Sequence, residues 1–322
     1  MPPPVEPAAP LPAVPRWRRV ARVVYLLIVV AAFAVAIVAR RRELVDQLSE
    51  LDLLPLLGSV IAGVTGVGVS GLIWRRMLVG VGSPLALRPA MRMFFLAQLG
   101  KYLPGSVWPV LAQAEMGQDH GIPRRSAVAA QTLFMWVHLV TGGVLGLPVL
   151  AAVRVIPWWL GLMPIILVPL LFPRFLGAVL NGLLRRLRRS PLPTVPSGRD
   201  MLIATGWALL MWAAYGIHIH LAVDALEFPA PGLLPVVASI GVFAAAWSAG
   251  FLFLIAPAGA GAREVVLLAG LSMVTAPQTA FTVTLISRLV LSLADGVWGG
   301  AGLAAGLRRR RGPAARSRGP AV

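Results

Sequence analysis

The stretch PLLGSVIAGVTGVGVSGLIW, Pro55–Trp74, has no charged side chain over its whole length. An apolar helix of roughly 20 residues is long enough to cross the hydrocarbon core of a bilayer, which is about 30 Å thick. Small residues recur every fourth position at Gly58, Ala62, Gly66 and Ser70, so they share one helical face that another helix can approach closely. The stretch therefore predicts a membrane-spanning helix with a close-packing face.

The composition of the whole chain agrees with this prediction. Hydrophobic residues make up 58% and charged residues 13% of the sequence, whereas charged residues are about a quarter of a soluble domain. The 29 basic and 12 acidic residues leave a net charge of +17, but they occur in short clusters between uncharged runs. Such clusters are typical of membrane topology signals, and no basic face of a soluble nucleic-acid-binding domain is visible. We therefore expect an integral membrane protein with no nucleic-acid partner.

The sequence offers little support for a cofactor or a metal ion. Cysteine is absent, which excludes disulfides and thiolate ligands. The run GVGVSG, Gly66–Gly71, matches the dinucleotide-binding pattern only formally, because it lies inside an uncharged span and not in a soluble βαβ unit. His138, His218 and His220 lack metal-site spacing, so we expect them to form hydrogen bonds between helices. We expect no cofactor and no bound metal.

Further long uncharged stretches complete the predicted fold class, an all-α polytopic membrane protein with about six full transmembrane helices. Residues 16–307 are expected to form one membrane domain, between a disordered proline-rich N-terminus (1–15) and a basic disordered tail (308–322). The arginine clusters favour a cytoplasmic location for both termini of a multi-pass protein of the cell membrane. Besides Pro55–Trp74, the predicted spans are Val23–Ala39, Ser126–Val153, Val155–Pro173, Met201–Val223 and about Thr279–Leu307.

Two remaining segments are interrupted, and we expect each to be a re-entrant hairpin. The first, Met91 to about Gly117, is broken at Pro104-Gly105, and the second, about Leu233 to Ala276, is broken at Ala256–Glu264. With both termini cytoplasmic, the crossings balance only if the hairpins enter from opposite faces. Irregular backbone at membrane depth must face protein or water. Interrupted segments in corresponding halves of a chain suggest an inverted pseudo-repeat with a binding site near the midplane.

Lys101 is the only lysine in the chain and precedes the Pro-Gly break of the first hairpin. One interpretation is that its long side chain reaches the headgroup layer and has no further role. The other is that it binds an anionic group, because ionisable residues at membrane depth usually line a pathway or have a partner.

Arg263 and Glu264 follow PAGAG in the second hairpin. A helix that begins near Ala262 would direct its positive end at the break, and with Arg263 it would suit a phosphate. Alternatively, both side chains only neutralise charges elsewhere, such as Glu115, Arg288 or Asp295. Arg288 and Asp295 are seven residues apart on one helix, too far for a direct pair, so each needs another partner.

Three stretches resemble the bacterial and archaeal flippase-like membrane proteins that share the transmembrane region of lysylphosphatidylglycerol synthase. They are FFLAQLGKYLPGSVWPV (Phe94–Val110), APAGAGAREVVL (Ala256–Leu268) and SRLVLSLADGVWGG (Ser287–Gly300). The resemblance implies a membrane domain that moves an aminoacylated phospholipid or a lipid-linked sugar between leaflets. Family members commonly carry Pro-Gly-Gly where this chain has Pro257-Ala258-Gly259. No aminoacyltransferase domain is expected after Leu307.

The leading hypothesis is a lipid translocase, and not an enzyme, whose substrate is a phospholipid or polyprenyl-linked lipid. Two alternatives stay open: an intramembrane transferase for polyprenyl-linked sugars, with Glu115, Asp119 or Glu264 as a base, and a non-catalytic membrane partner of a glycosyltransferase. A lipid-modifying enzyme as partner and a homo-oligomer are also compatible with the sequence. The expected substrate-binding residues are Lys101, Tyr102, Pro104, Gly105, Trp108, Glu115, Gly259, Gly261, Arg263, Glu264, Arg288 and Asp295.

Overall fold

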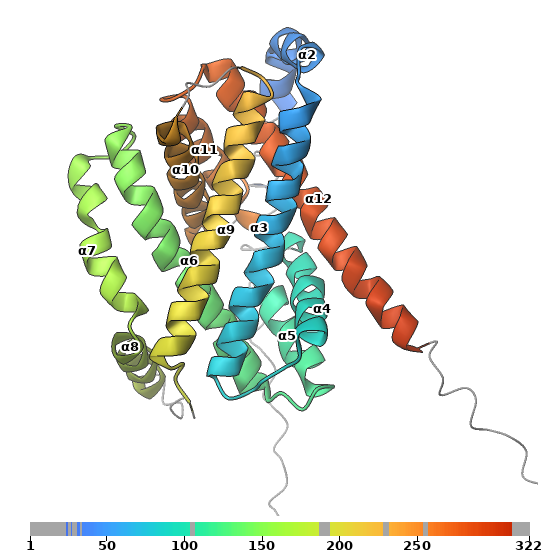
Figure 1. Cartoon of the computed structure of the whole chain (residues 1–322), viewed down its shortest axis with the longest axis vertical. Helices are drawn as coiled ribbons and strands as arrows, with labels where there is room; N and C mark the ends of the chain where they lie inside the picture. The colour runs from blue at the N-terminus through green and yellow to red at the C-terminus, as the bar shows by residue number, and fades with distance from the viewer. Residues whose placement is uncertain are drawn as a thin grey trace, which may run out of the picture.

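The computed structural model of the chain describes Val24, Leu27 and residues 31–32, 34–103, 107–186, 194–227, 232–253 and 257–310. Within these residues the chain is helical throughout, with no strand, and the helices form an elongated bundle (Figure 1). Five helices of the described part are long and apolar enough to cross a membrane: α3 (Leu53–Gly80), α6 (Arg124–Ala152), α9 (Gly198–Asp224), α10 (Leu233–Leu252) and α12 (Pro277–Arg310). The predicted class of a polytopic α-helical membrane protein is confirmed.

Four of the predicted spans correspond to α3, α6, α9 and α12, whereas α10 belongs to the predicted second hairpin. Two further differences concern Val155–Pro173 and the end of α12. The stretch Val155–Pro173 is not one helix but three short pieces, η2 (Trp158–Leu162), α7 (Pro164–Leu167) and η3 (Val168–Leu171). Prolines 157, 164 and 169 explain the breaks, because proline has no N–H to donate inside a helix. Helix α12 continues to Arg310, so the first residues assigned to the tail are helical.

Other parts of the prediction fall on the ends of the chain. Of the predicted first span Val23–Ala39, residues 34–39 are helical, and residues 23, 25–26, 28–30 and 33 lie outside the described residues. The predicted disordered segments 1–15 and 311–322 also lie outside them. The exact number of membrane crossings stays a prediction.

Helices α3 and α9 form the antiparallel centre of the bundle (Figure 1). At one end the Asp52 amide donates to the Ala225 carbonyl over 2.9 Å, and at the other Arg76 pairs with Asp200. Glycines of the predicted small-residue face lie directly against α9: a methyl group built on Gly58 would meet Leu221, and one on Gly66 would meet Tyr215. The predicted close-packing face of this helix is confirmed.

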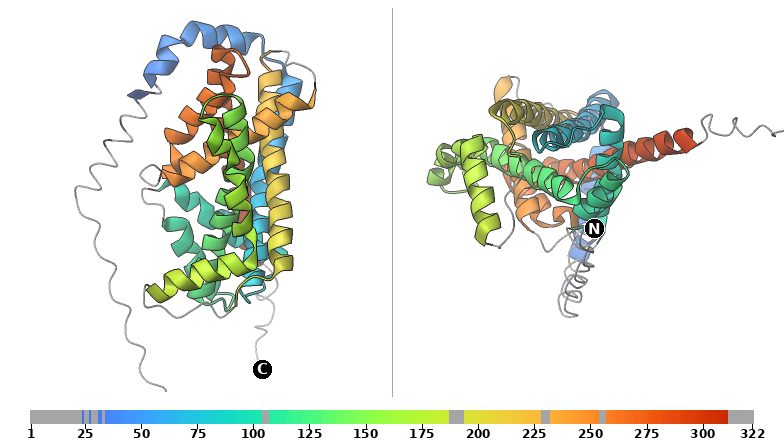
Figure 2. Two further views of the ribbon diagram at one scale, coloured as in Figure 1. Left: turned by 90° about the vertical axis from the view of Figure 1, so that its left-hand side faces the viewer. Right: turned by 90° about the horizontal axis from the view of Figure 1, so that it is seen from below.

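The two interrupted segments are helical hairpins that approach each other from opposite ends of the bundle. The first consists of α4 (Leu87–Gln98), η1 (Leu99–Tyr102) and α5 (Trp108–Gln118), and its Pro104-Gly105 break lies outside the described residues. The second consists of α10, η4 (Pro257–Gly259) and α11 (Ala262–Leu271). In Figure 2, left, the first fills the lower half of the bundle and the second the upper half. Their tips, η1 and η4, are in contact. Insertion of the hairpins into a bilayer as re-entrant segments stays a prediction.

The packing pattern has the symmetry of the suggested inverted pseudo-repeat. If α3, α4, α5 and α6 are exchanged with α9, α10, α11 and α12, the main helix contacts are preserved. In particular, α4 packs on α12 as α10 packs on α6. Because α3 and α9 are antiparallel, the two four-helix units are inverted relative to each other.

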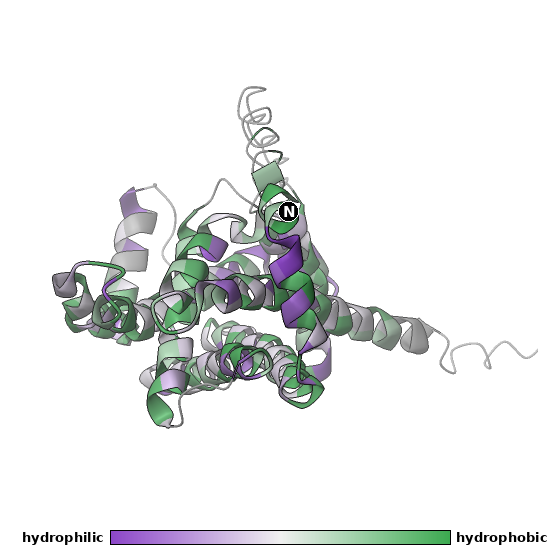
Figure 3. Cartoon of the chain, turned by 90° about the horizontal axis from the view of Figure 1, so that it is seen from above, coloured by the Kyte–Doolittle hydropathy of each residue, from purple (hydrophilic) through white to green (hydrophobic). Residues whose placement is uncertain are grey.

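Two helices lie across the ends of the bundle, α2 (Arg41–Ser49) at the upper end and α8 (Pro173–Arg186) at the lower end (Figure 2, left). The view from above shows the hydrophilic residues of α2 on this end (Figure 3). Gln47 of α2 contacts α12 by accepting from the Thr282 hydroxyl and donating to the Thr279 hydroxyl. Charged residues thus gather at the ends, and the sides of the bundle stay apolar.

Candidate functional site

A cavity of about 180 Å³ lies where the two hairpin tips meet. Its walls come from both hairpins and from α3, α6, α9 and α12. The charged residues among its described lining are Lys101, Arg263, Arg288 and Asp295. Residues from the three sequence motifs are therefore brought together at one place in the fold.

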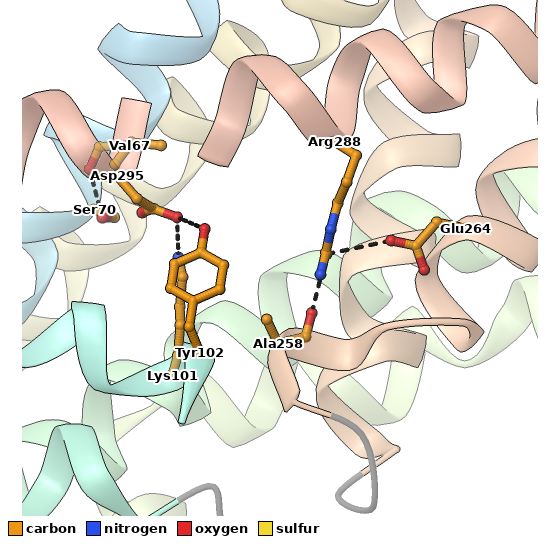
Figure 4. Close-up of polar contacts among 8 residues, drawn as sticks. All are labelled: Val67, Ser70, Lys101, Tyr102, Ala258, Glu264, Arg288 and Asp295. Carbon is orange, nitrogen blue, oxygen red and sulfur yellow. Dashed lines mark hydrogen bonds and ion pairs between the residues drawn. The ribbon is translucent and has the colours of Figure 1, made fainter. Parts of the chain in front are cut away.

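Asp295 of α12 binds the tip of the first hairpin. The Lys101 ammonium lies 2.7 Å from the Asp295 carboxylate, and the Tyr102 hydroxyl donates to the same oxygen over 2.6 Å (Figure 4). The Asp295 side chain is 7% exposed and that of Lys101 is 35% exposed. Lys101 therefore does not simply extend to the headgroup layer, because it has a nearly buried counter-charge beside the cavity.

Glu264 of α11 has two partners. One carboxylate oxygen accepts from the Gly261 amide over 2.6 Å, and the other lies 3.2 Å from Arg288, which also donates to the Ala258 carbonyl (Figure 4). The prediction that Arg288 and Asp295 each need another partner is confirmed. Helix α11 begins at Ala262 as expected, but the Gly261 amide at its N-terminus is already occupied by Glu264. The helix end was expected to offer free N–H donors to a phosphate. For the Gly261 amide this expectation is wrong, because that amide already donates to Glu264.

Arg263 has no carboxylate within ion-pair distance among the described residues. Its guanidinium lies over the Phe243 ring, 4.8 Å from the centroid, and the residue lines the cavity. A ring face attracts a cation but does not neutralise its charge. Lys101 and Arg288 are paired with Asp295 and Glu264, so the positive charge left over at the cavity belongs to Arg263.

The turn before α11 sets the position of Arg263. Gly259 and Gly261 have φ values of +69° and +91°, and Ala258 has a φ of +50°. A Cβ on Gly259 would lie 2.7 Å from the backbone of Gly250 in α10, so only glycine allows the tip to pack this closely. The Ala258 that replaces the expected glycine adopts the same left-handed conformation, and the tight turn is formed.

A chain of three buried side chains reaches the cavity from the first half of the fold. The Trp74 indole donates to the Gln113 side-chain oxygen over 2.9 Å, and the Gln113 amide nitrogen donates to the Gln131 oxygen over 2.8 Å. Gln131 is fully buried and lines the cavity. Its amide nitrogen has no partner among the residues that the structure describes. Sequence reasoning did not identify this chain, although a glutamine within the uncharged span Ser126–Val153 is a signal that could have been used.

Not every predicted site residue lies at the cavity. Glu115 is exposed on α5 and pairs with Arg124 at 2.9 Å, and neither Glu115 nor Trp108 belongs to the described lining. Gly261 holds Glu264 through its amide and does not line the cavity. Pro104 and Gly105 lie outside the described residues.

The predicted hydrogen bonding of a histidine between helices is confirmed for His218. The His218 ring bonds to Ser59 of α3 at 2.8 Å and to Ser287 of α12 at 3.1 Å. The His138 ring bonds instead to the Phe134 carbonyl of its own helix at 3.0 Å, and it packs against the Trp247 ring of α10. Over the described part of the chain, no three His, Cys, Asp or Glu side chains are grouped so that they could hold a metal ion.

Comparison with known proteins places the chain in a family. The model of the lysylphosphatidylglycerol synthase transmembrane region matches residues 22–299, so the chain belongs to this family of membrane proteins. The match includes both hairpins and the charged residues of the cavity. No curated protein matches the chain.

Proposed function

We propose that this protein moves a phosphate-bearing lipid headgroup between the two leaflets of the cell membrane, through the cavity between its hairpin tips. The observation that carries the proposal is Arg263, a cavity-lining guanidinium without a carboxylate partner among the described residues. A guanidinium presents paired donors that match phosphate oxygens. The cavity then holds a net positive charge until an anion enters it.

The physical task of such a protein is to lower the cost of moving a charged headgroup through hydrocarbon. An isolated charge at membrane depth is expensive because it loses its hydration. Fixed donors from Arg263, Lys101 and Arg288 replace that hydration, while the apolar tails remain in the bilayer. The Lys101 ammonium can have two partners: it is bound to Asp295 in the structure, and an incoming phosphate competes with Asp295 for it. The direction of movement then follows the substrate gradient or a coupled reaction.

The arrangement of charges at the two ends supports the predicted orientation. The end that carries the start of α4 and the end of α12 also carries Arg76, Arg88 and Arg199. At the opposite end, Arg41 and Arg42 of α2 are followed by Glu43 and Asp46 in the same helix. The excess of arginine at the first end favours the cytoplasm as its location.

The test is a headgroup-movement assay in reconstituted vesicles. Vesicles with the purified protein carry acyl-labelled NBD-phosphatidylglycerol, and dithionite bleaches only the probe in the outer leaflet. We expect Arg263→Gln to slow movement at least about tenfold, because a hydrogen bond to a charged group contributes about 1.5–3 kcal/mol. Arg124→Gln, which removes an exposed arginine far from the cavity lining, is the matched control and should keep the wild-type rate.

The results that would overturn the proposal are specific. Wild-type vesicles that bleach no faster than protein-free ones, for phosphatidylglycerol and for polyprenyl-phosphate probes, would exclude translocation. A wild-type rate in both Arg263→Gln and Lys101→Ala would exclude the cavity as the route. If, in addition, substitutions on the small-residue face around Gly66 abolish the cellular function, the protein acts as a non-catalytic membrane partner. Product formation from polyprenyl-linked sugars in detergent would favour a transferase, although Glu264 and Asp295 are both held in ion pairs.

A further inference from the structure

The cavity contains a donor that the charge argument does not use. Gln131 is 0% exposed, lines the cavity and has a side-chain nitrogen without a partner among the described residues. Buried polar groups are almost always hydrogen-bonded, so an unpartnered amide beside a cavity indicates an acceptor that enters it. Gln131 lies on α6, whereas the three basic residues of the cavity, Lys101, Arg263 and Arg288, lie on η1, α11 and α12.

The direction of the Gln131 amide follows from its neighbours. An indole N–H can only donate, so the Gln113 oxygen must face Trp74, and the Gln113 nitrogen must face Gln131. The Gln131 oxygen is therefore occupied by Gln113, and its nitrogen is left for another acceptor. The oxygen and nitrogen of a side-chain amide are hard to tell apart by position alone. Here the Trp74 indole N–H fixes which is which in both glutamines.

The cavity lining to which Gln131 belongs contains many aromatic rings. Phe94 and Phe134 pack edge to face with ring centroids 5.1 Å apart, and Trp247 stacks on Phe251 at 5.5 Å, all within the cavity lining. A neutral donor among aromatic faces suits a neutral oxygen on a compact group with C–H faces. A phosphate oxygen is matched better by the guanidinium and ammonium groups of the same cavity.

We propose that Gln131 is a specificity-determining residue that donates to a hydroxyl oxygen of the headgroup, so that the transported lipid carries a hydroxylated group next to its phosphate. The inference rests on the proposed function and adds a substrate class to it. The hydroxyl can belong to the glycerol headgroup of a phospholipid or to the sugar of a polyprenyl phosphate. Gln113 and Trp74 act as positioning residues for the Gln131 amide.

The test compares two probes that differ only in hydroxyl groups. NBD-phosphatidylglycerol and NBD-phosphatidylpropanol have the same phosphate and the same charge. A site built to bond a hydroxyl rejects an analogue that lacks it, so we expect wild-type vesicles to move phosphatidylglycerol at least about tenfold faster than phosphatidylpropanol. Gln131→Leu should lower the phosphatidylglycerol rate to that of phosphatidylpropanol and leave the phosphatidylpropanol rate unchanged.

A control variant and a second measurement keep the result interpretable. Gln118→Leu removes an exposed glutamine of α5 that bonds to Glu115, and it should leave both rates at the wild-type level. Ligand that binds only the folded protein raises its melting temperature. In detergent, phosphatidylglycerol should therefore raise the melting temperature of wild-type protein more than phosphatidylpropanol does, and the two should act equally on Gln131→Leu. This comparison works even if the variant is less stable.

The source of the hydroxyl is distinguished by two further probes of equal charge, a polyprenyl-phosphate glucose and the cyclohexyl ester of the same polyprenyl phosphate, which has no hydroxyl group. If Gln131→Leu removes the rate difference only between the two polyprenyl probes, the substrate is a lipid-linked sugar. If it removes the difference only between phosphatidylglycerol and phosphatidylpropanol, the substrate is a phospholipid. Equal movement of hydroxylated and plain probes by wild-type protein, or an equal loss of both in Gln131→Leu, would overturn the inference while the proposed function stands. If no probe moves, the proposed function itself fails.

Discussion

Asp295 is the residue on which the tip of the first hairpin depends. It accepts from Lys101 and Tyr102 at 2.7 and 2.6 Å, and its own side chain is almost buried. Removing one member of a buried pair leaves an uncompensated charge, whereas removing both charges is often nearly neutral. The effects of removing Lys101 and of removing Asp295 on the free energy of unfolding should therefore not be additive.

The coupling is tested with Lys101→Met, Asp295→Asn and the double variant. We expect Lys101→Met to destabilise the protein by about 2 kcal/mol, because the buried Asp295 carboxylate is left without its counter-charge. Asp295→Asn should cost less, because the Lys101 side chain is 35% exposed and water can solvate its ammonium. The double variant should recover most of this loss. Thermal unfolding in detergent, followed by size-exclusion fluorescence, gives the three melting temperatures. Additive losses in the double variant would show that the pair makes no coupled contribution to stability.

At the level of single residues, the sequence pointed to part of the site. Lys101, Arg263, Arg288 and Asp295 were identifiable because a charge inside an apolar segment needs a partner or a pathway. The Arg288–Glu264 pair was among the alternatives that the sequence offered. The Lys101–Asp295 pair was not, since Lys101 lies on a hairpin far from Asp295 in sequence. Gln131 was missed because a neutral amide gives a weaker signal than a charge, and its importance depends on Gln113 and Trp74.

At the level of elements, length and proline content were the informative features. Uncharged runs predicted α3, α6, α9 and α12, and the breaks at Pro104-Gly105 and Ala256–Glu264 predicted the two hairpins. The run Val155–Pro173 failed as a span because hydropathy does not register the missing N–H groups of its prolines. Helix α8 was not predicted, because the uncharged run between Arg174 and Arg185 is too short to cross a bilayer.

Close crossing of α6 and α10 is the element-scale feature that supports the cavity wall. A Cβ on Gly146 would lie 2.6–2.8 Å from backbone atoms of Ala245, whereas one on Gly206 of α9 would meet nothing within 4 Å. Gly146→Ala should destabilise the protein by about 1–3 kcal/mol, because the two helices must move apart. Gly206→Ala, the matched control, should be neutral or stabilising by up to about 1 kcal/mol. Melting temperatures in detergent check both, and equal effects would show that the crossing is not tight.

At the level of the whole molecule, the four-helix units α3–α6 and α9–α12 pack their hairpins on each other. Each hairpin packs on the last long helix of the other unit, α4 on α12 and α10 on α6. Neither unit can therefore build its share of the cavity alone, and the hairpin tips meet only when both are assembled. Sequence could suggest the inverted arrangement from the two broken segments, but the packing of each hairpin on the other unit is three-dimensional, and no local pattern encodes it.

The inverted arrangement makes a direct prediction about topology, and the absence of cysteine from the chain makes it easy to test. His120, exposed between α5 and α6, and Ala276, exposed between α11 and α12, lie at opposite ends of the bundle. Excess arginine at the end of His120 favours the cytoplasm for that end. In intact cells, a membrane-impermeant maleimide should therefore label Ala276→Cys and not His120→Cys, and permeabilised cells should show labelling of both. Labelling of both variants in intact cells would contradict two hairpins that enter from opposite sides, because the loops would then share one face. Labelling of His120→Cys alone would keep the inverted fold and reverse its orientation, because the end that carries His120 would then face outward.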